Sequence, residues 1–165
     1  MRLQERCSRS RVERVGSESD WYARYRGCIM SSSPPDISAL YLATVVTVEA
    51  ASVWRLAHEV AAELGTLHVI TAWNPGDERP SRTENEHAND ALHADLTLLG
   101  YTPMRALGSD PSSSHAEESF AVIGFNDRDA RKLGAKYGQV AVFRITSATQ
   151  TVLACLAPWE VERGV

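Results

Sequence analysis

Two adjacent carboxylates, Glu117 and Glu118, are the side chains in this sequence best suited to acid or base chemistry. They stand at the head of a predicted strand, where successive side chains point to opposite faces, so one of them is expected to face a cleft. A carboxylate partly removed from water can act as a general base or as a metal ligand. The alternative is a surface acid or a cap for loop amides. Both interpretations remain open.

Polar residues that could bind a ligand recur near the ends of the predicted strands. Asn85 extends the apolar face of a predicted helix with an amide. It either contacts a ligand beside the helix N-terminus, where free amides favour an anion, or anchors the loop at residues 74–80. Gln139 either orients a ligand or bridges two strands. The predicted ligand-binding residues are Trp73, Asn74, Ser81, Asn85, Asp110, Ser119 and Gln139.

Other reactive side chains give weaker signals. Glu86, Asp90 and His93 recur at helical spacing, and His115 precedes the two glutamates, but these positions match no recognised metal motif, so no metal site is predicted. Neither a Gly-x-Gly-x-x-Gly nor a Walker pattern is present, which leaves a nucleotide as one option and the cofactor unknown. Cys155 lies in an apolar run and is expected to be a small packing residue.

Local patterns predict the elements that position these groups. Ser81 with Glu84 matches a capping box, Asn126 or Asp127 can cap a further helix, and glycines are placed to end each helix. Ser52 is expected to cap the first helix. The predicted strands cover 40–48, 67–73, 103–107, 119–125, 140–145 and 151–156, and the predicted helices cover 52–64, 82–99 and about 127–137.

This order predicts an α/β fold, with α+β as the alternative, built on a single mixed β-sheet with three main helices in two or three layers. Strands joined by a helix are expected to run parallel and strands joined by a loop antiparallel. The second and third strands should then end, and the fourth and fifth begin, at one edge. The candidate residues should therefore converge there, where α/β proteins favour ligand binding.

Composition limits the partners. The 165 residues carry a net charge of −4, yet residues 1–29 hold seven arginines against four acidic side chains, so the remainder carries −7. Such an acidic domain lacks the footprint of nucleic-acid binding, and no apolar stretch approaches the length of a membrane span. We expect a cytoplasmic protein. Residues 1–37 are predicted to be a disordered or misassigned extension, with Met30 as a candidate start, 38–160 a single domain and 161–165 a tail.

Several short motifs resemble a bacterial family catalogued as a domain of unknown function, DUF3293. They are Thr71-Ala72-Trp73-Asn74-Pro75, Ser81 with Glu84-Asn85, Leu99-Gly100, Gly108, Glu117-Glu118-Ser119-Phe120 and Tyr137-Gly138-Gln139. The resemblance covers about residues 40–145. It implies no known activity.

The sequence therefore predicts a protein that binds a small polar or anionic metabolite at the sheet edge, with hydrolase-type chemistry as an option. Glu118 and Glu117 are the candidate catalytic residues. Whether the protein is an enzyme stays open, as does its oligomeric state. The competing hypothesis is a non-catalytic protein–protein interaction or regulatory module, in which the same polar groups only fasten loops.

Overall fold

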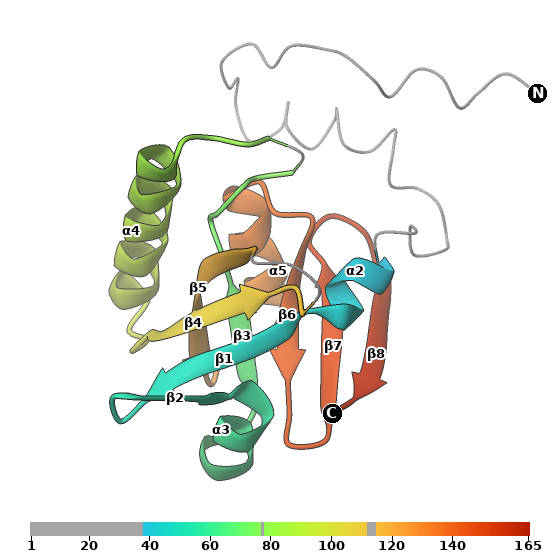
Figure 1. Ribbon diagram of the computed structural model, residues 1–165. Helices are drawn as coiled ribbons and strands as arrows, with labels where there is room; N and C mark the ends of the chain where they lie inside the picture. Colours follow the sequence, from blue (N-terminus) through green and yellow to red (C-terminus); the bar gives the residue numbers. More distant parts are fainter. Residues whose placement is uncertain (1–37, 77, 112–114) are drawn as a thin grey trace, which may run out of the picture.

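The computed structural model describes residues 38–76, 78–111 and 115–165 (Figure 1). Residues 1–37, which contain the predicted extension and the candidate start at Met30, lie outside the described residues. The same is true of Asp77 and residues 112–114, which belong to two predicted loops.

The described residues form one eight-stranded sheet with helices on both faces. The elements, in chain order, are α2 (Ser38–Ala43), β1 (Val45–Ala50), β2 (Val53–Leu56), α3 (Ala57–Leu64), β3 (Leu67–Ile70), α4 (Arg82–Leu98), β4 (Met104–Ser109), β5 (Ala116–Ile123), α5 (Asp127–Lys136), β6 (Ala141–Ile145), β7 (Thr149–Ala154) and β8 (Glu160–Gly164).

The predicted α/β content is confirmed, but the prediction of a mixed sheet is wrong. The strand order is β2-β1-β4-β5-β3-β6-β7-β8, and every neighbouring pair is antiparallel. The crossover through α4 does return the chain so that β3 and β4 run the same way. However, β5 lies between them, so the two strands never pair. One edge of the sheet, called the loop edge below, thus collects the ends of β3 and β4 and the starts of β5 and β6.

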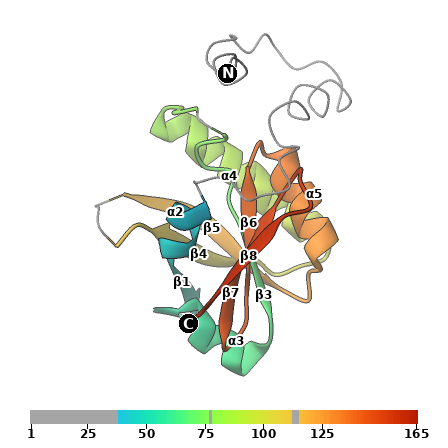
Figure 2. The ribbon, with the colours of Figure 1, turned by 90° about the vertical axis from the view of Figure 1, so that its right-hand side faces the viewer.

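The sheet is curled and has two differently covered faces (Figures 1 and 2). The inner face is covered by α2 and α3, and the outer face by α4 and α5. Residues of β3 alternate between the faces: Val69 packs in the inner core with Val60 of α3, and Ile70 packs in the outer core with Leu92 of α4. All four residues of β3 are buried because both faces of this central strand are covered.

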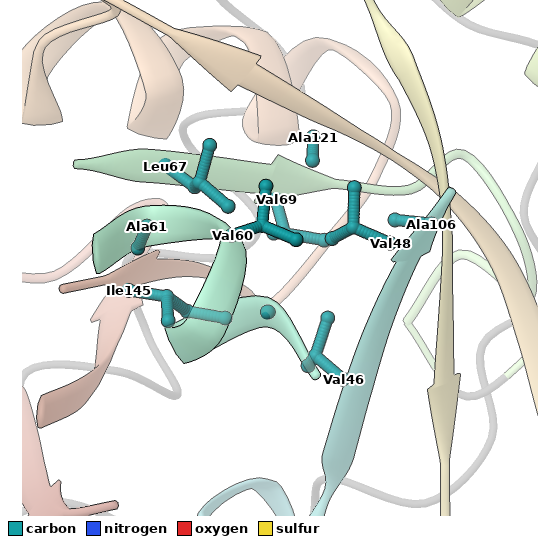
Figure 3. Close-up of a cluster of buried hydrophobic side chains, with 10 residues drawn as sticks. Val46, Val48, Val60, Ala61, Leu67, Val69, Ala106, Ala121 and Ile145 are labelled. Atoms are coloured by element: carbon teal, nitrogen blue, oxygen red, sulfur yellow. The ribbon is translucent and has the colours of Figure 1, made fainter. Parts of the chain in front are cut away.

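The inner core is aliphatic. Figure 3 shows side chains from α3, β1, β3 and β6 gathered between the curled strands, among them Val46, Val48, Leu67 and Ile145. Residues of β1 and β6, which are not neighbours in the sheet, belong to one core because the sheet curls around α3. The curl therefore creates an interior on this side of the sheet.

The first two predicted elements are wrong in part. Residues 40–48 were expected to be one strand but divide into the end of α2 and the start of β1. The helix expected at 52–64 begins only at Ala57, because residues before it form β2 of a tight hairpin. Ala51 and Ser52 form the turn with φ of 51° and 64°, a left-handed backbone that usually selects Gly or Asn. Ser52 is thus a turn residue and does not cap a helix.

The helices with capping signals are confirmed. Ser81 and Glu84 form the predicted capping box of α4, and Asn126 accepts the Asp129 amide at the start of α5.

Gly134 of α5 is required for close packing, since a Cβ there would lie 2.6 Å from Cys155 Sγ. Burial raises the pKa of the Cys155 thiol to about 12, which fits a packing role. Residues 160–164 form strand β8, where no strand was predicted.

Candidate functional site

The segment that follows β3 is held at the loop edge by hydrogen bonds from α4 and β5. Asn89, which is buried on α4, accepts the Ala72 amide at 2.9 Å and donates to the Glu118 carbonyl at 2.9 Å. The Thr71 hydroxyl donates to the same carbonyl at 2.7 Å. Two side chains therefore fix the backbone of Glu118 on β5.

Asn74 is the centre of a second set of contacts. Its backbone has a φ of 47°, a left-handed conformation that costs energy in a residue other than Gly. Asn85 stabilises it by accepting the Asn74 amide at 2.9 Å and donating to Asn74 Oδ1 at 3.1 Å. The Asn74 side chain then donates to Glu117 Oε1 at 2.8 Å. The structure thus brings together three predicted site residues, Asn74, Asn85 and Glu117, here called the Asn74 network. Their mutual hydrogen bonds are those expected of residues that anchor a loop.

Gln139 joins the same region. It is buried in the short connection between α5 and β6 and donates to the Trp73 carbonyl at 3.1 Å, so it ties this connection to the segment after β3. Asp110 lies just beyond β4, and its backbone amide donates to the His115 carbonyl at 3.2 Å. Both residues are at the loop edge, as the strand directions require.

The N-terminus of α4 is closed by its own residues. The Ser81 hydroxyl accepts the Glu84 amide at 3.3 Å, and the Glu84 carboxylate accepts the Ser81 amide at 2.8 Å. Hydrogen bonds from the Ser81 side chain and backbone lower the pKa of Glu84, which keeps a negative charge at this helix end. The capping box therefore occupies groups that an anionic ligand would need.

Glu117 and Glu118 have different surroundings, as expected for neighbours on a strand. The Glu117 carboxylate is engaged by Asn74 and lies 3.1 Å from His115 Nε2. The Glu118 carboxylate makes no hydrogen bond or ion pair with a described residue, although its backbone is fixed. Of the two candidate acids, Glu118 is the one that the fold leaves available.

Glu118 lines a hollow of about 170 Å³, here called the Glu118 hollow, on the outer face beside α4. The ring of Trp54, from edge strand β2, lies 5.6 Å from the Arg105 guanidinium, which pairs with Glu49 at 3.2 Å. The hollow is lined by Trp54, Arg105, Ala106, Leu107, Glu118, Ser119 and Phe120. Asn74, Asn85 and Gln139 do not line it, so the predicted residues divide into a fastened network and an open hollow.

Trp54 and Arg105 were not predicted site residues. Trp54 falls within the helix predicted at 52–64, and only the hairpin geometry places it on the same face of the sheet as Glu118. A buried His68 on β3 was also not predicted; its Nε2 lies 2.7 Å from Asp127 Oδ1, and its Nδ1 has no partner among the described residues. No local sequence pattern indicates that Trp54 and Arg105 lie near Glu118, or that His68 lies near Asp127.

Two further features bear on function. Among the described residues, no group of three or more His, Cys, Asp or Glu side chains is arranged to bind a metal ion. In the same part of the chain, none of the helices combines the length and apolar character needed to cross a bilayer.

The comparison with known families agrees with the motifs at the loop edge. Residues 70–142 match the family described as protein of unknown function (DUF3293). This range runs from the end of β3 into β6 and contains the Asn74 network together with Glu118. No match was found among curated proteins or among solved structures. The chain therefore carries a DUF3293 family domain over residues 70–142.

Proposed function

We propose that this protein binds a small polar ligand in the Glu118 hollow, through hydrogen-bond donors or a positive charge on the ligand. One observation carries the proposal: the Glu118 carboxylate makes no hydrogen bond or ion pair within the described residues and feels only the more distant charge of Arg82, while Thr71 and Asn89 hold its backbone in place. A rigidly supported polar group beside a hollow is the arrangement expected of a binding site.

The walls indicate the shape of the ligand. Trp54 and Phe120 offer aromatic surface next to the carboxylate, and Arg105 is already paired with Glu49. A flat ligand with amine or amide donors, such as a nucleobase or an aromatic amine, matches these groups. An anionic ligand is less favoured, because Glu118 itself lines the hollow, Arg105 is paired with Glu49, and the α4 capping box is closed.

Glu118 also supplies the chemistry that a hydrolase would need. An unpaired carboxylate can accept a proton from a water or hydroxyl held beside it, which is the role of a general base. We propose Glu118 for this role in preference to Glu117, whose carboxylate is engaged by Asn74.

The proposal is tested by a ligand screen with two matched variants. Nucleobases, nucleosides and aromatic amines are added to the full chain while thermal unfolding is followed. A ligand present at about 100 times its Kd stabilises the wild type by about 2.7 kcal/mol, a shift of several degrees in Tm. Glu118→Gln should lose this shift. Glu117→Gln should keep it, because a glutamine oxygen can still accept the Asn74 amide.

Two outcomes would contradict the proposal. One is a panel in which no compound raises the Tm of the wild type. The other is a ligand that stabilises Glu118→Gln and the wild type equally, since such a ligand does not use the carboxylate. Conversion of the ligand by the wild type, and not by Glu118→Gln, would support the catalytic role.

A second candidate function, a protein interaction module, is favoured by strand β2. This strand is at the edge of the sheet and exposes Val53 by 58% and Trp54 by 43%. An exposed apolar edge strand can pair with an extended peptide through its backbone. Val53→Lys should abolish binding of a selected peptide and leave the small ligand unaffected, because Val53 does not line the hollow. Failure of a peptide selection to enrich any binder would exclude this candidate.

A further inference from the structure

A second cavity, of about 200 Å³, opens on the inner face of the sheet beside α3. It shares no residue with the Glu118 hollow or with the Asn74 network. Its apolar walls include Val45, Val46, Leu56 and Ile145. Figure 3 shows Val46 and Ile145 on strands that face each other across this interior. The curl of the sheet thus provides a space with aliphatic sides.

Arg163, from β8, is the charged group of this cavity. One of its terminal nitrogens, Nη2, donates to the Thr44 carbonyl at 3.3 Å and to Gln150 Oε1 at 3.4 Å. Arg163 forms no ion pair with any residue in the described part of the chain. Its Nε atom is shielded from solvent and has no hydrogen-bond partner there. The guanidinium therefore retains donors and a positive charge that the fold does not neutralise.

Gln150 holds the guanidinium in place. It is 3% exposed, faces Arg163 directly across the β7–β8 pair, and donates to the Thr44 carbonyl at 3.0 Å. The same strand register pairs Gln150 with Ile145, so an aliphatic, an amide and a cationic side chain lie in one row across β6, β7 and β8. His58, at the start of α3, adds an imidazole to the lining.

A guanidinium is always charged at physiological pH, so its charge in this cavity persists. A charge that is partly removed from water and lacks a counter-ion is costly, and an anion that enters relieves this cost. We propose that the cavity binds a small monocarboxylate, whose carboxylate pairs with Arg163 and whose apolar body packs against the valine, leucine and isoleucine walls. The planar guanidinium matches a carboxylate through two parallel hydrogen bonds.

The walls select among anions. A single cation in an aliphatic space favours one negative charge attached to an apolar body over a compact, strongly hydrated anion such as phosphate. The volume limits the ligand to about the size of hexanoate or benzoate, since it lies below the usual range for drug-sized ligands.

The test uses the ¹⁵N-labelled full chain and four organic probes at pH 7: hexanoate, benzoate and the uncharged amides of both acids. Inorganic phosphate is the fifth probe. The signals followed are the Arg163 Nε–H and the side-chain amide of Gln150. We expect saturable shifts of both with the two carboxylates, and binding of the amides that is at least about tenfold weaker.

Two arginine substitutions locate the effect. Arg163→Gln should weaken carboxylate binding by at least about tenfold. Arg128→Gln removes an exposed arginine of α5 that lines neither cavity, and this variant should bind as the wild type does. The comparison of acid with amide needs only the wild type, so it decides the question even if Arg163→Gln does not fold.

Three results would overturn the proposal: no shift of the Arg163 and Gln150 signals with either carboxylate, equal binding of acid and amide, or equal binding of phosphate and the carboxylates. The first result would show that the cavity does not bind carboxylates. The second would show that the negative charge of the ligand is not recognised, and the third that the apolar walls do not contribute to selectivity.

Discussion

Two arginines on neighbouring parts of the sheet have opposite surroundings. Arg144 of β6 is on the outer face and pairs with Asp127, with Glu160 and Glu162 of β8 within 4.0 Å and 3.8 Å. Arg163 of β8 is on the inner face and contacts only a backbone carbonyl and an amide in the described residues. The fold supplies three carboxylates to one arginine and none to the other.

The difference distinguishes a charged group that stabilises the fold from one that is available to bind a ligand. On the outer face, Asp127 joins Arg144 to the buried His68, and Thr151 joins Arg144 to Glu162. The charged members of this group pair with one another, as in a network that stabilises the fold. On the inner face the row of Ile145, Gln150 and Arg163 ends at a cavity. A charge that the fold leaves unpaired there is available to a ligand.

The largest effect is expected when the Asp127 carboxylate, which joins His68 to Arg144 on the outer face, is removed. Asp127→Ala leaves the buried Nε2 of His68 without an acceptor and takes a counter-ion from Arg144. We expect the free energy of unfolding to fall by about 2–4 kcal/mol, measured by urea titration. Asp127→Asn, which retains an acceptor, should lose less. If Asp127→Ala unfolds at the wild-type urea concentration, the outer group is not structural.

The second test exchanges each arginine for methionine. Arg144→Met should lower the free energy of unfolding by about 2 kcal/mol, because three carboxylates lose their shared partner. Arg163→Met should change it by less than about 1 kcal/mol, because the methionine removes an unpaired charge and Gln150 still bonds to Thr44. Equal losses in the two variants, in urea titrations at the same pH, would abolish the distinction.

The smallest expected effect is a pH dependence from His68. Burial lowers the pKa of His68 below its ordinary value of 6.5, against the opposing effect of its hydrogen bond to Asp127. The unfolded chain therefore binds the proton more readily, and stability falls as pH drops below about 6.5. Between pH 7.5 and 5.5 the loss should be at most about 1.4 kcal/mol, the limit for one proton that only the unfolded chain binds.

Asp127 does not contribute in this range. Burial alone raises the pKa of Asp127, but the hydrogen bond from His68 and the charge of Arg144 lower it below 3.8 overall. Its contribution is therefore lost only at lower pH. In His68→Gln, whose amide can still donate to Asp127, the dependence between pH 7.5 and 5.5 should shrink. An unchanged dependence in that variant would assign it to other groups.

The parts of the fold predicted from sequence are those with local chemical signals. The caps at Ser81 and Asn126 act within one helical turn, so both helices begin where expected. Strand directions at the loop edge also follow from local connections, which is why Asn74, Asn85 and Glu117 were predicted to converge. Their ligand roles stay predictions, because the contacts among them are those of an anchored loop.

The parts that sequence did not predict depend on contacts between distant residues. The apolar residues at 53–56 fit a helical stripe, but pairing with β1 through a turn of two non-glycine residues makes them a strand. The insertion of β5 between β3 and β4 leaves no trace in either segment. The unpaired state of Arg163 is likewise visible only once β1, β7 and β8 are placed around it.

Strand β8 places opposite charges on the two faces of the sheet. Because side chains alternate, Glu160 and Glu162 lie on the outer face and Arg163 on the inner one, as fixed by the pairs Thr151–Glu162 and Gln150–Arg163. A shift of one residue in this register would bring Glu162 into the cavity and Arg163 beside Arg144, which reverses the sign of the field at both places. The last strand of the sheet therefore sets, by its register alone, which sign of charge each face can receive.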